Sequence, residues 1–194
     1  TRGAAPEAEA DDIHYPGTYM AGGYNRLKTE IAERVVENED LVNMPNWLLT
    51  RFRIEDGNWF NLMSVVIRSY RQELDLRKGV LSRTVHFRDR EGRETVIAME
   101  RLVHMEQMHL AAQTLLITPV NWSGRIELHS ALDGTVINAG VERYKQLASK
   151  HLEPLGEGTF GENGIWLLTQ TNQSHMRIAL AARTRLYGNT NGDE

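Results

Sequence analysis

The 194-residue sequence contains no cysteine, and no apolar run in it approaches the roughly 20 residues that a membrane-spanning helix requires. The absence of cysteine excludes disulfides, thiolate zinc sites and cysteine nucleophiles, and it fits a reducing compartment. The amino-terminal stretch TRGAAPEAEADD also lacks the charged and apolar regions of a signal peptide. We therefore expect a cytoplasmic protein with no membrane partner.

The sequence also lacks an excess of positive charge. Its formal net charge is -4 and both signs are interspersed, so it offers neither a basic patch for nucleic acid nor a polybasic membrane anchor. A composition of 41% hydrophobic and 25% charged residues is typical of a globular protein. No internal repeat is visible, which argues against a propeller or a solenoid, and the length suits one domain.

A run of adjacent antiparallel strands is predicted between Tyr70 and Met105. Leu81, Val85 and Phe87 fall on one parity and the intervening residues on the other, which is the period-2 pattern of a strand with one apolar face. Residues 89–92 (DREG) supply turn chemistry before a second β-rich run that begins at Thr95. The economical connection is a hairpin, whose apolar face needs a cover.

Similar strands are predicted on both sides of this ribbon. Trp47–Ile54 alternates, and the Asp56-Gly57 turn predicts a hairpin to Trp59–Val66. The apolar run His109–Ile117 is followed by Pro119, which stops it or places it at a sheet edge. Further strands are predicted over residues 126–132, 165–171 and 174–185. Many short strands with turns between them predict a β-sandwich of two stacked antiparallel sheets, in an all-β fold with one or two short helices.

The remaining segments are less regular. Lys28–Glu37 (KTEIAERVVE) predicts one or two helical turns, although its adjacent valines disfavour a helix. Val141–His151 is predicted as a short helix or as a long ordered excursion, and the glycine-rich stretch Gly156–Gly164 as a loop. We expect residues 1–12 to be a flexible lead-in, residues 13–187 a single β-sandwich domain and residues 188–194 a disordered tail.

No candidate catalytic or metal motif is complete. The seven histidines include no i, i+4 pair with a glutamate between them, so no metal site is predicted. Gly156, Gly158 and Gly161 imitate a dinucleotide fingerprint, but a strand follows where the phosphate-binding helix should begin. Glu73 and Asp75 share one parity of a strand, where solvated or arginine-paired carboxylates are commoner than an acid–base pair. The sequence predicts no catalytic residue.

Aromatic residues are the remaining candidates for ligand binding. Trp59 and Trp122 are candidate platforms for a sugar ring, and a role in the core or in a turn is the alternative. The stretch His14–Tyr24 (HYPGTYMAGGY) has three tyrosines among glycines and a proline, which predicts an ordered loop. Its rings either line a sugar site or fasten the loop to its own domain.

Several stretches together resemble the amino-terminal domain of glycoside hydrolase family 65: HYPGTYMAGGYNRL, ENEDLVNMPNWL, YRQELDLRKGVLSRTV, TPVNWSGRIELHSALDG and QTNQSH. The resemblance covers nearly the whole chain. That family contains inverting disaccharide phosphorylases acting on maltose, trehalose, kojibiose or nigerose, along with some hydrolases. The resemblance implies a galactose-mutarotase-like supersandwich, joined by a helical linker to an (α/α)6 barrel that supplies the general-acid glutamate and the phosphate site.

By this resemblance, the chain is a non-catalytic domain of a larger enzyme, truncated at both ends and inactive alone. We expect it to support the catalytic barrel, to contribute to a homodimer and to lend the loop His14–Tyr24 to the active-site rim. Tyr15, Tyr19 and Asn25 are the expected contacts with the carbohydrate substrate. No cofactor is expected, and inorganic phosphate is the co-substrate if the parent enzyme is a phosphorylase.

Two alternatives belong to other functional classes. A free-standing carbohydrate-binding module is motivated by Trp59, Trp122 and the tyrosines. A small mutarotase-like enzyme would use a histidine and a carboxylate inside the sandwich. Titration of the chain with disaccharides tests the first alternative, and polarimetry of α-glucose tests the second.

Overall fold

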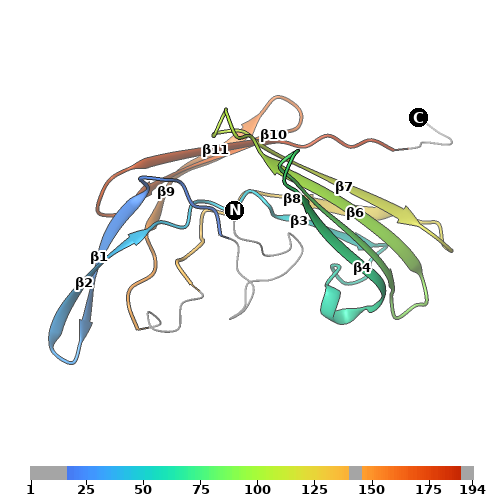
Figure 1. Cartoon of the computed structure of the whole chain (residues 1–194), viewed down its shortest axis with the longest axis horizontal. Helices are drawn as coiled ribbons and strands as arrows, with labels where there is room; N and C mark the ends of the chain where they lie inside the picture. The colour runs from blue at the N-terminus through green and yellow to red at the C-terminus, as the bar shows by residue number, and fades with distance from the viewer. Residues whose placement is uncertain (1–16, 140–145, 189–194) are drawn as a thin grey trace. The chain divides into compact units, whose positions relative to one another are not determined.

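The computed structural model describes residues 17–139 and 146–188, which form eleven strands and one turn of 3-10 helix (Figure 1). No α-helix occurs in these two ranges. The strands form four sheets with the orders β1-β2, β3-β8, β4-β5-β6-β7 and β11-β10-β9. The prediction of an all-β fold built from antiparallel sheets is therefore confirmed. The lead-in predicted at residues 1–12 and nearly all of the predicted tail lie outside the described residues.

The chain divides into two compact units. Unit 1 comprises Thr1–Arg51 and His129–Glu194, and unit 2 comprises Phe52–Leu128. The boundaries fall within β3 (Thr50–Ile54) and β8 (Ile126–Ser130), which pair with each other. Each candidate site described below lies within one unit.

Unit 2 contains a four-stranded antiparallel sheet with the order β4 (Val66–Asp75), β5 (Val80–Arg88), β6 (Glu94–Val103) and β7 (Ala111–Pro119). The predicted alternation in β5 is confirmed, because Val85 and Phe87 are buried whereas Thr84 is exposed. Val85 lies opposite Ile97, and Ile97 lies opposite Ile117, so one face of the sheet carries the core. β7 is an edge strand that ends at its proline, as predicted.

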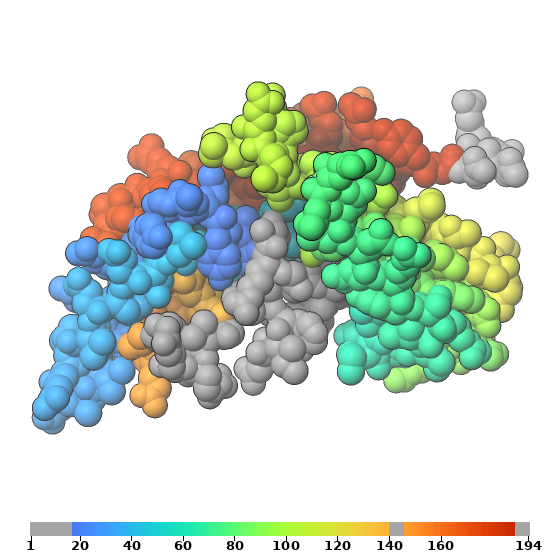
Figure 2. Space-filling model, viewed as in Figure 1, coloured from blue at the N-terminus to red at the C-terminus, as the bar shows by residue number. Residues whose placement is uncertain are grey.

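The other edge strand of this sheet, β4, differs from its neighbours because every residue except Asp75 is exposed. Its exposed apolar side chains include Val66 at 58%, Tyr70 at 48% and Leu74 at 55%. The segment around β4 is drawn in green on the viewed face in Figure 2. This strand therefore leaves both unpaired backbone groups and apolar surface open to solvent.

Unit 1 contains the hairpin of β1 (Tyr24–Ile31) and β2 (Arg34–Leu41), and a three-stranded antiparallel sheet of β9 (Leu152–Phe160), β10 (Gly164–Thr171) and β11 (Arg177–Arg183). Its core cluster consists of Val42, Met44, Val136 and Leu152, with Met176 and Ile178 packed against it. Because β10 lies between β9 and β11, its alternate residues Leu167, Thr169 and Thr171 are buried on the core side.

The helical turns predicted over Lys28–Glu37 are wrong, since these residues form the β1–β2 hairpin. Lys28 pairs directly with Glu37 in the antiparallel register, and their side chains form an ion pair at 3.9 Å. The tip residues Ala32 and Glu33 have φ angles of 48° and 63°. A tip of this kind usually contains glycine or asparagine, so the local sequence carries no clear turn signal.

The hairpin predicted between Trp47–Ile54 and Trp59–Val66 is also wrong. The turn itself forms, because the Gly57 N–H donates to the Ile54 carbonyl at 3.1 Å. However, β3 pairs with β8 rather than with the segment that follows it, and that segment contains the 3-10 turn Leu62–Ser64. A partner more than 70 positions along the chain leaves no trace in a local pattern.

The glycine-rich stretch Gly156–Gly164 is not the predicted loop. Gly156 and Gly158 lie inside β9, and only residues 161–163 form the turn to β10. These two glycines face the Trp166 ring of the neighbouring strand. The helix weighed for Val141–His151 is absent over residues 146–151, and the rest of that segment lies outside the described residues.

Candidate functional site

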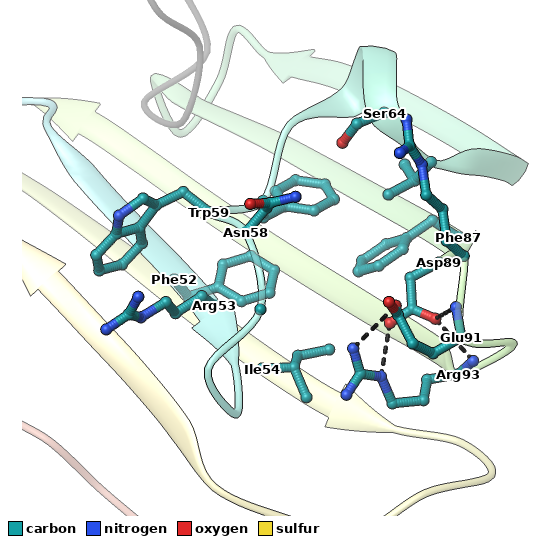
Figure 3. Close-up of a pocket in the computed structure, with 14 residues that line it drawn as sticks. Phe52, Arg53, Ile54, Asn58, Trp59, Ser64, Phe87, Asp89, Glu91 and Arg93 are labelled. Atoms are coloured by element: carbon teal, nitrogen blue, oxygen red, sulfur yellow. Dashed lines mark hydrogen bonds and ion pairs between the residues drawn. The ribbon is translucent and has the colours of Figure 1, made fainter.

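A cavity of about 110 Å³ lies in unit 2 beside the turn that follows β3 (Figure 3). Its floor is aromatic: the ring centroids of Phe52 and Phe60 are 4.8 Å apart, and those of Phe60 and Phe87 are 4.6 Å apart. All three side chains belong to the buried core of the unit. The volume is below the roughly 300–1,000 Å³ of a typical ligand pocket, so the cavity has room for only part of a ligand.

Charged residues from the β5–β6 turn line one side of this cavity (Figure 3). Asp89 Oδ1 accepts hydrogen bonds from the backbone N–H groups of Glu91 at 3.0 Å and Arg93 at 2.9 Å. The Arg93 guanidinium donates from Nε to Asp89 Oδ2 at 2.6 Å and from Nη2 to Glu91 Oε2 at 3.2 Å. These charges satisfy one another, so the arrangement fixes a turn and presents no carboxylate poised as an acid or a base.

Trp59, a predicted sugar platform, lines the same cavity and is half-buried. The Arg53 guanidinium carbon lies 5.0 Å from the centroid of its ring. Arg53 is itself held by Glu127, whose Oε2 accepts from Nε at 2.8 Å and from Nη2 at 2.6 Å. One face of the indole is thus occupied by a cation–π contact. A sugar could therefore stack only on the face opposite Arg53, and the predicted contact stays a prediction.

Trp122, the second predicted platform, contributes to the packing of unit 2. Its Nε1 donates to the Glu94 carbonyl and to Thr95 Oγ1, both at 3.0 Å. The half-buried ring packs against the aromatic core cluster. The structure therefore gives this tryptophan the turn-anchoring role that was the alternative, and a sugar contact there remains untested.

Asn25, a predicted rim residue, lies at the centre of a buried polar cluster in unit 1. Its Nδ2 donates to Asn172 Oδ1 at 2.8 Å and lies 3.1 Å from His151 Nδ1. Its Oδ1 accepts from the backbone N–H groups of Gln173 at 3.2 Å and Ser174 at 2.8 Å. With 1% of its surface exposed, Asn25 ties β1 to the turn between β10 and β11. Its predicted contact with a substrate stays a prediction.

His151 completes this cluster and lies beside a carboxylate. Its Nε2 is 3.4 Å from Asp40 Oδ2, and Asn38 Nδ2 donates to the same oxygen. Burial lowers the pKa of His151 below its ordinary value of 6.5, and the negative charge of Asp40 opposes that shift. A histidine and a carboxylate can perform acid–base chemistry, but this imidazole is only 1% exposed. We interpret the pair as a structural one.

The two tyrosines predicted at the rim differ in what the structure describes. Tyr15 lies outside the described residues, and Tyr19 is half-buried in a loop that precedes β1. The loop is fixed by the Thr18 N–H, which donates to Asn43 Oδ1 at 2.9 Å, and by the Met44 N–H, which donates to the Thr18 carbonyl at 2.7 Å. Tyr19 and Asn25 belong to unit 1, whereas both predicted tryptophan platforms belong to unit 2.

Over residues 17–139 and 146–188, no three histidine, aspartate or glutamate side chains are grouped so that they could hold a metal ion. The described part of the chain also contains no helix long and apolar enough to cross a membrane.

The whole sequence, residues 1–194, matches the family described as glycosyl hydrolase family 65, N-terminal domain. The chain belongs to glycosyl hydrolase family 65. The resemblance carried by its sequence stretches is thereby confirmed, and the family 65 chain corresponds to the amino-terminal domain of that family.

Individual relatives of this family 65 chain are much longer than it is. A glycosyl hydrolase of Mycobacterium tuberculosis is 46% identical over 96% of the chain, which spans 14% of that relative. The kojibiose phosphorylase of Caldanaerobacter subterraneus is 31% identical over 92% of the chain, which spans 22% of it. The trehalose 6-phosphate phosphorylase of Lactococcus lactis is 28% identical over 96% of the chain, which spans 23% of it. The chain thus corresponds to less than a quarter of each of these proteins.

This family 65 domain also has an exposed aromatic residue that is not among the predicted site residues. Trp166 is 38% exposed on β10, opposite Gly158 of β9. The alternating glycines of β9 are a signal that could have revealed it, because glycine inside a strand often marks the close approach of another group. By composition alone, the same glycines predict a loop.

Proposed function

We propose that this chain is the non-catalytic β-sandwich domain of a larger family 65 enzyme that acts on an α-glucosyl disaccharide. The observation that carries the proposal is the match of the whole chain to an amino-terminal family domain, combined with its span of 14–23% of the relatives. Two of those relatives are named as phosphorylases of kojibiose and of trehalose 6-phosphate. The described acid–base groups support a non-catalytic role, because His151 is buried and the charges of the Asp89 turn are paired.

In the proposed enzyme, this domain supports an (α/α)6 catalytic barrel and contributes to a homodimer. The exposed edge strand β4 supports an interaction of this kind, since an apolar edge strand left in solvent tends to associate. The loop before β1, with Tyr15 and Tyr19, would reach the rim of the active site. The proposed location is the cytoplasm.

The chemical step is assigned to the barrel. A general-acid glutamate there would protonate the leaving glycosidic oxygen while phosphate or water attacks the anomeric carbon from the opposite face. The bond from that carbon to the glycosidic oxygen breaks, and the new bond inverts the configuration. With phosphate as the attacking group, inorganic phosphate is a co-substrate, and no other cofactor is proposed.

A carbohydrate-binding module is the second candidate function. It is favoured by Trp59, whose ring lines a cavity with an aromatic floor and polar sides (Figure 3). Such a mixture of apolar and polar groups suits a sugar ring, although the cavity accepts only part of one.

An activity assay on the 194-residue chain and on the complete enzyme tests the leading proposal. We expect the complete enzyme to cleave kojibiose, trehalose or maltose and the chain alone to leave all three intact, with circular dichroism showing that the chain is folded. Cleavage by the folded chain would overturn the non-catalytic role.

In the complete enzyme, replacing Tyr15 and Tyr19 by alanine should raise KM or lower kcat, and unchanged constants would remove the loop from the rim.

A further inference from the structure

The outer face of the sheet formed by β9, β10 and β11 carries an indole ring that lies across two strands. Trp166 of β10 is paired with Gly158 of β9 and Ala181 of β11. A Cβ added at Gly158 would lie 2.9 Å from Trp166 Nε1, and one added at Gly156 would lie 3.5 Å from Cη2. The ring therefore extends from β10 over the backbone of β9, with its long edge above both glycines.

This position leaves one face of the ring open. The glycines lie under the indole, and the core of the unit is on the other side of the sheet, where Leu167 and Thr169 are buried. The Trp166 side chain is nevertheless 38% exposed to solvent. Because tryptophan is seldom fully buried in proteins, this exposure counts together with the two glycines beneath the ring and not by itself. The two glycines make room for a ring that lies along the surface.

The residues beside the ring keep the surface flat. On β11, the outward residues are Ala179 and Ala181, both exposed and both too short to rise above the indole. Opposite them, β9 contributes only glycine backbone. With strands roughly 4.8 Å apart, the three strands form an apolar floor about 10 Å wide. The one further side chain in these two rows is Leu168 of β10, which pairs with Gly156 and Ala179.

Polar groups border this floor at both ends. In the row that pairs Phe160, Gly164 and Arg183, the Arg183 guanidinium carbon lies 5.8 Å from the centroid of the Phe160 ring. At the other end, Gln170 pairs with Glu153 and with Arg177. Hydrogen-bond donors and acceptors thus flank an apolar centre, and the charges are of both signs.

We propose that this surface, defined by Trp166, Gly156, Gly158, Ala179 and Ala181, is a binding site for a neutral α-glucosyl saccharide. The apolar C–H face of a pyranose stacks on the open indole face, because its weakly positive hydrogens meet the negative π-face of the ring. Arg183, in the next row, then lies within reach of hydroxyl groups of the stacked sugar, and Gln170, four residues along β10, lies within reach of those of a neighbouring glucosyl unit. The mixed signs of charge disfavour a nucleic acid.

The size of the surface also favours a small ligand over a protein. A stable protein interface buries about 800 Å² on each partner and is anchored in well-packed pockets. This floor is centred on one aromatic anchor, Trp166, which suits a sugar chain that lies across a sheet. The inference goes beyond the supporting role proposed above, and only the choice of α-glucosyl sugars rests on that proposal.

Calorimetric titration of the 194-residue chain with maltohexaose tests the site. We expect the unmodified chain to bind, and Trp166→Ala and Ala181→Glu each to weaken the affinity at least tenfold. Ala181→Glu leaves the ring in place and only obstructs the floor, so it keeps the test valid if Trp166→Ala fails to fold. The matched control is Ala112→Glu, because Ala112 is an exposed strand alanine of unit 2; it should change the affinity less than twofold.

The absence of binding by the folded, unmodified chain would overturn the inference, and so would unchanged affinity in both variants. If Trp166 instead contacts the rest of the enzyme, Trp166→Ala would alter the stability of the complete enzyme and the chain would bind no saccharide. The outcome is independent of the catalytic proposal, since saccharide binding is measured on the 194-residue chain, which is proposed to be inactive, whereas catalysis is measured on the complete enzyme. Lost catalysis and lost binding are therefore separate results.

Discussion

Among single residues, His151 is a buried histidine whose pKa the folded chain shifts. Burial lowers its pKa in the folded chain below the ordinary value of 6.5, while the unfolded chain keeps that ordinary value. Well above pH 6.5 the His151 imidazole is neutral in both the folded and the unfolded chain, so the free energy of unfolding does not depend on its titration. As the pH falls through 6.5 towards the folded pKa, the unfolded state takes up a proton first, so the free energy of unfolding decreases.

We therefore predict that the free energy of unfolding is lower at pH 5.5 than at pH 7.5, because the unfolded chain takes up a proton at His151 before the folded chain does. Urea unfolding at the two pH values measures the loss. His151→Gln should reduce the pH dependence, because glutamine does not titrate. A pH dependence that His151→Gln leaves unchanged would contradict this account.

Two other residues show how far a single position can be interpreted from its type. Asn25 is predicted to contact the substrate because the segment before it is aromatic and rich in glycine. In the structure its amide group makes four hydrogen bonds inside unit 1. Trp166 is not predicted as a ligand contact, although its indole ring is more exposed than those of Trp59 and Trp122. Residue type limits what a side chain can bind, but burial depends on the strands that surround it.

At the scale of elements, the β1–β2 hairpin has an unfavourable tip. Ala32 and Glu33 both adopt positive φ, which costs roughly 1–2 kcal/mol per residue for residues other than glycine. We predict that Glu33→Gly stabilises the hairpin by about 1 kcal/mol, because glycine adopts this conformation without a steric penalty. Slower hydrogen exchange at the amides that pair β1 with β2 would measure the gain.

The matched control for this prediction is Glu30→Gly, which makes the same change inside β1. Glycine in a strand interior costs roughly 0.5–1 kcal/mol, so exchange at the same amides should become faster. If both variants change exchange in the same direction, the tip conformation does not limit the stability of the hairpin.

Elements whose partners are nearby in sequence were the ones that could be predicted. The β5–β6 hairpin was predicted correctly, because alternation and a DREG turn lie within one short stretch. The partner of β3 was assigned wrongly, because β8 lies far along the chain. In β9, glycine suggested a loop, although the real cause is the Trp166 ring on the next strand.

At the scale of the whole molecule, the two core clusters have no residue in common. One cluster contains Phe52, Phe60 and Phe87 in unit 2, and the other contains Val42 and Leu152 in unit 1. We predict that Phe87→Ala costs about 3–5 kcal/mol, because Phe87 is 1% exposed and contacts Phe60. Hydrogen exchange should accelerate in β5 and β6 and stay slow in β9 and β10.

The reciprocal variant for the other core is Leu152→Ala, expected to cost about 2–5 kcal/mol and to accelerate exchange in β9 and β10. If each variant accelerates exchange equally in both units, the two clusters unfold as one cooperative core. The prediction that each cluster stabilises only its own unit would then be wrong.

The sequence by itself determined the all-β class, the alternation of the central ribbon and the membership of family 65. These features are local or are carried by contiguous stretches, so they need no knowledge of distant partners. Only the tertiary structure decided which strand pairs with β3, that Asn25 points into a polar cluster and that Trp166 lies open over two glycines. Those outcomes depend on which side chains meet across strands, and such long-range contacts leave no period in the sequence.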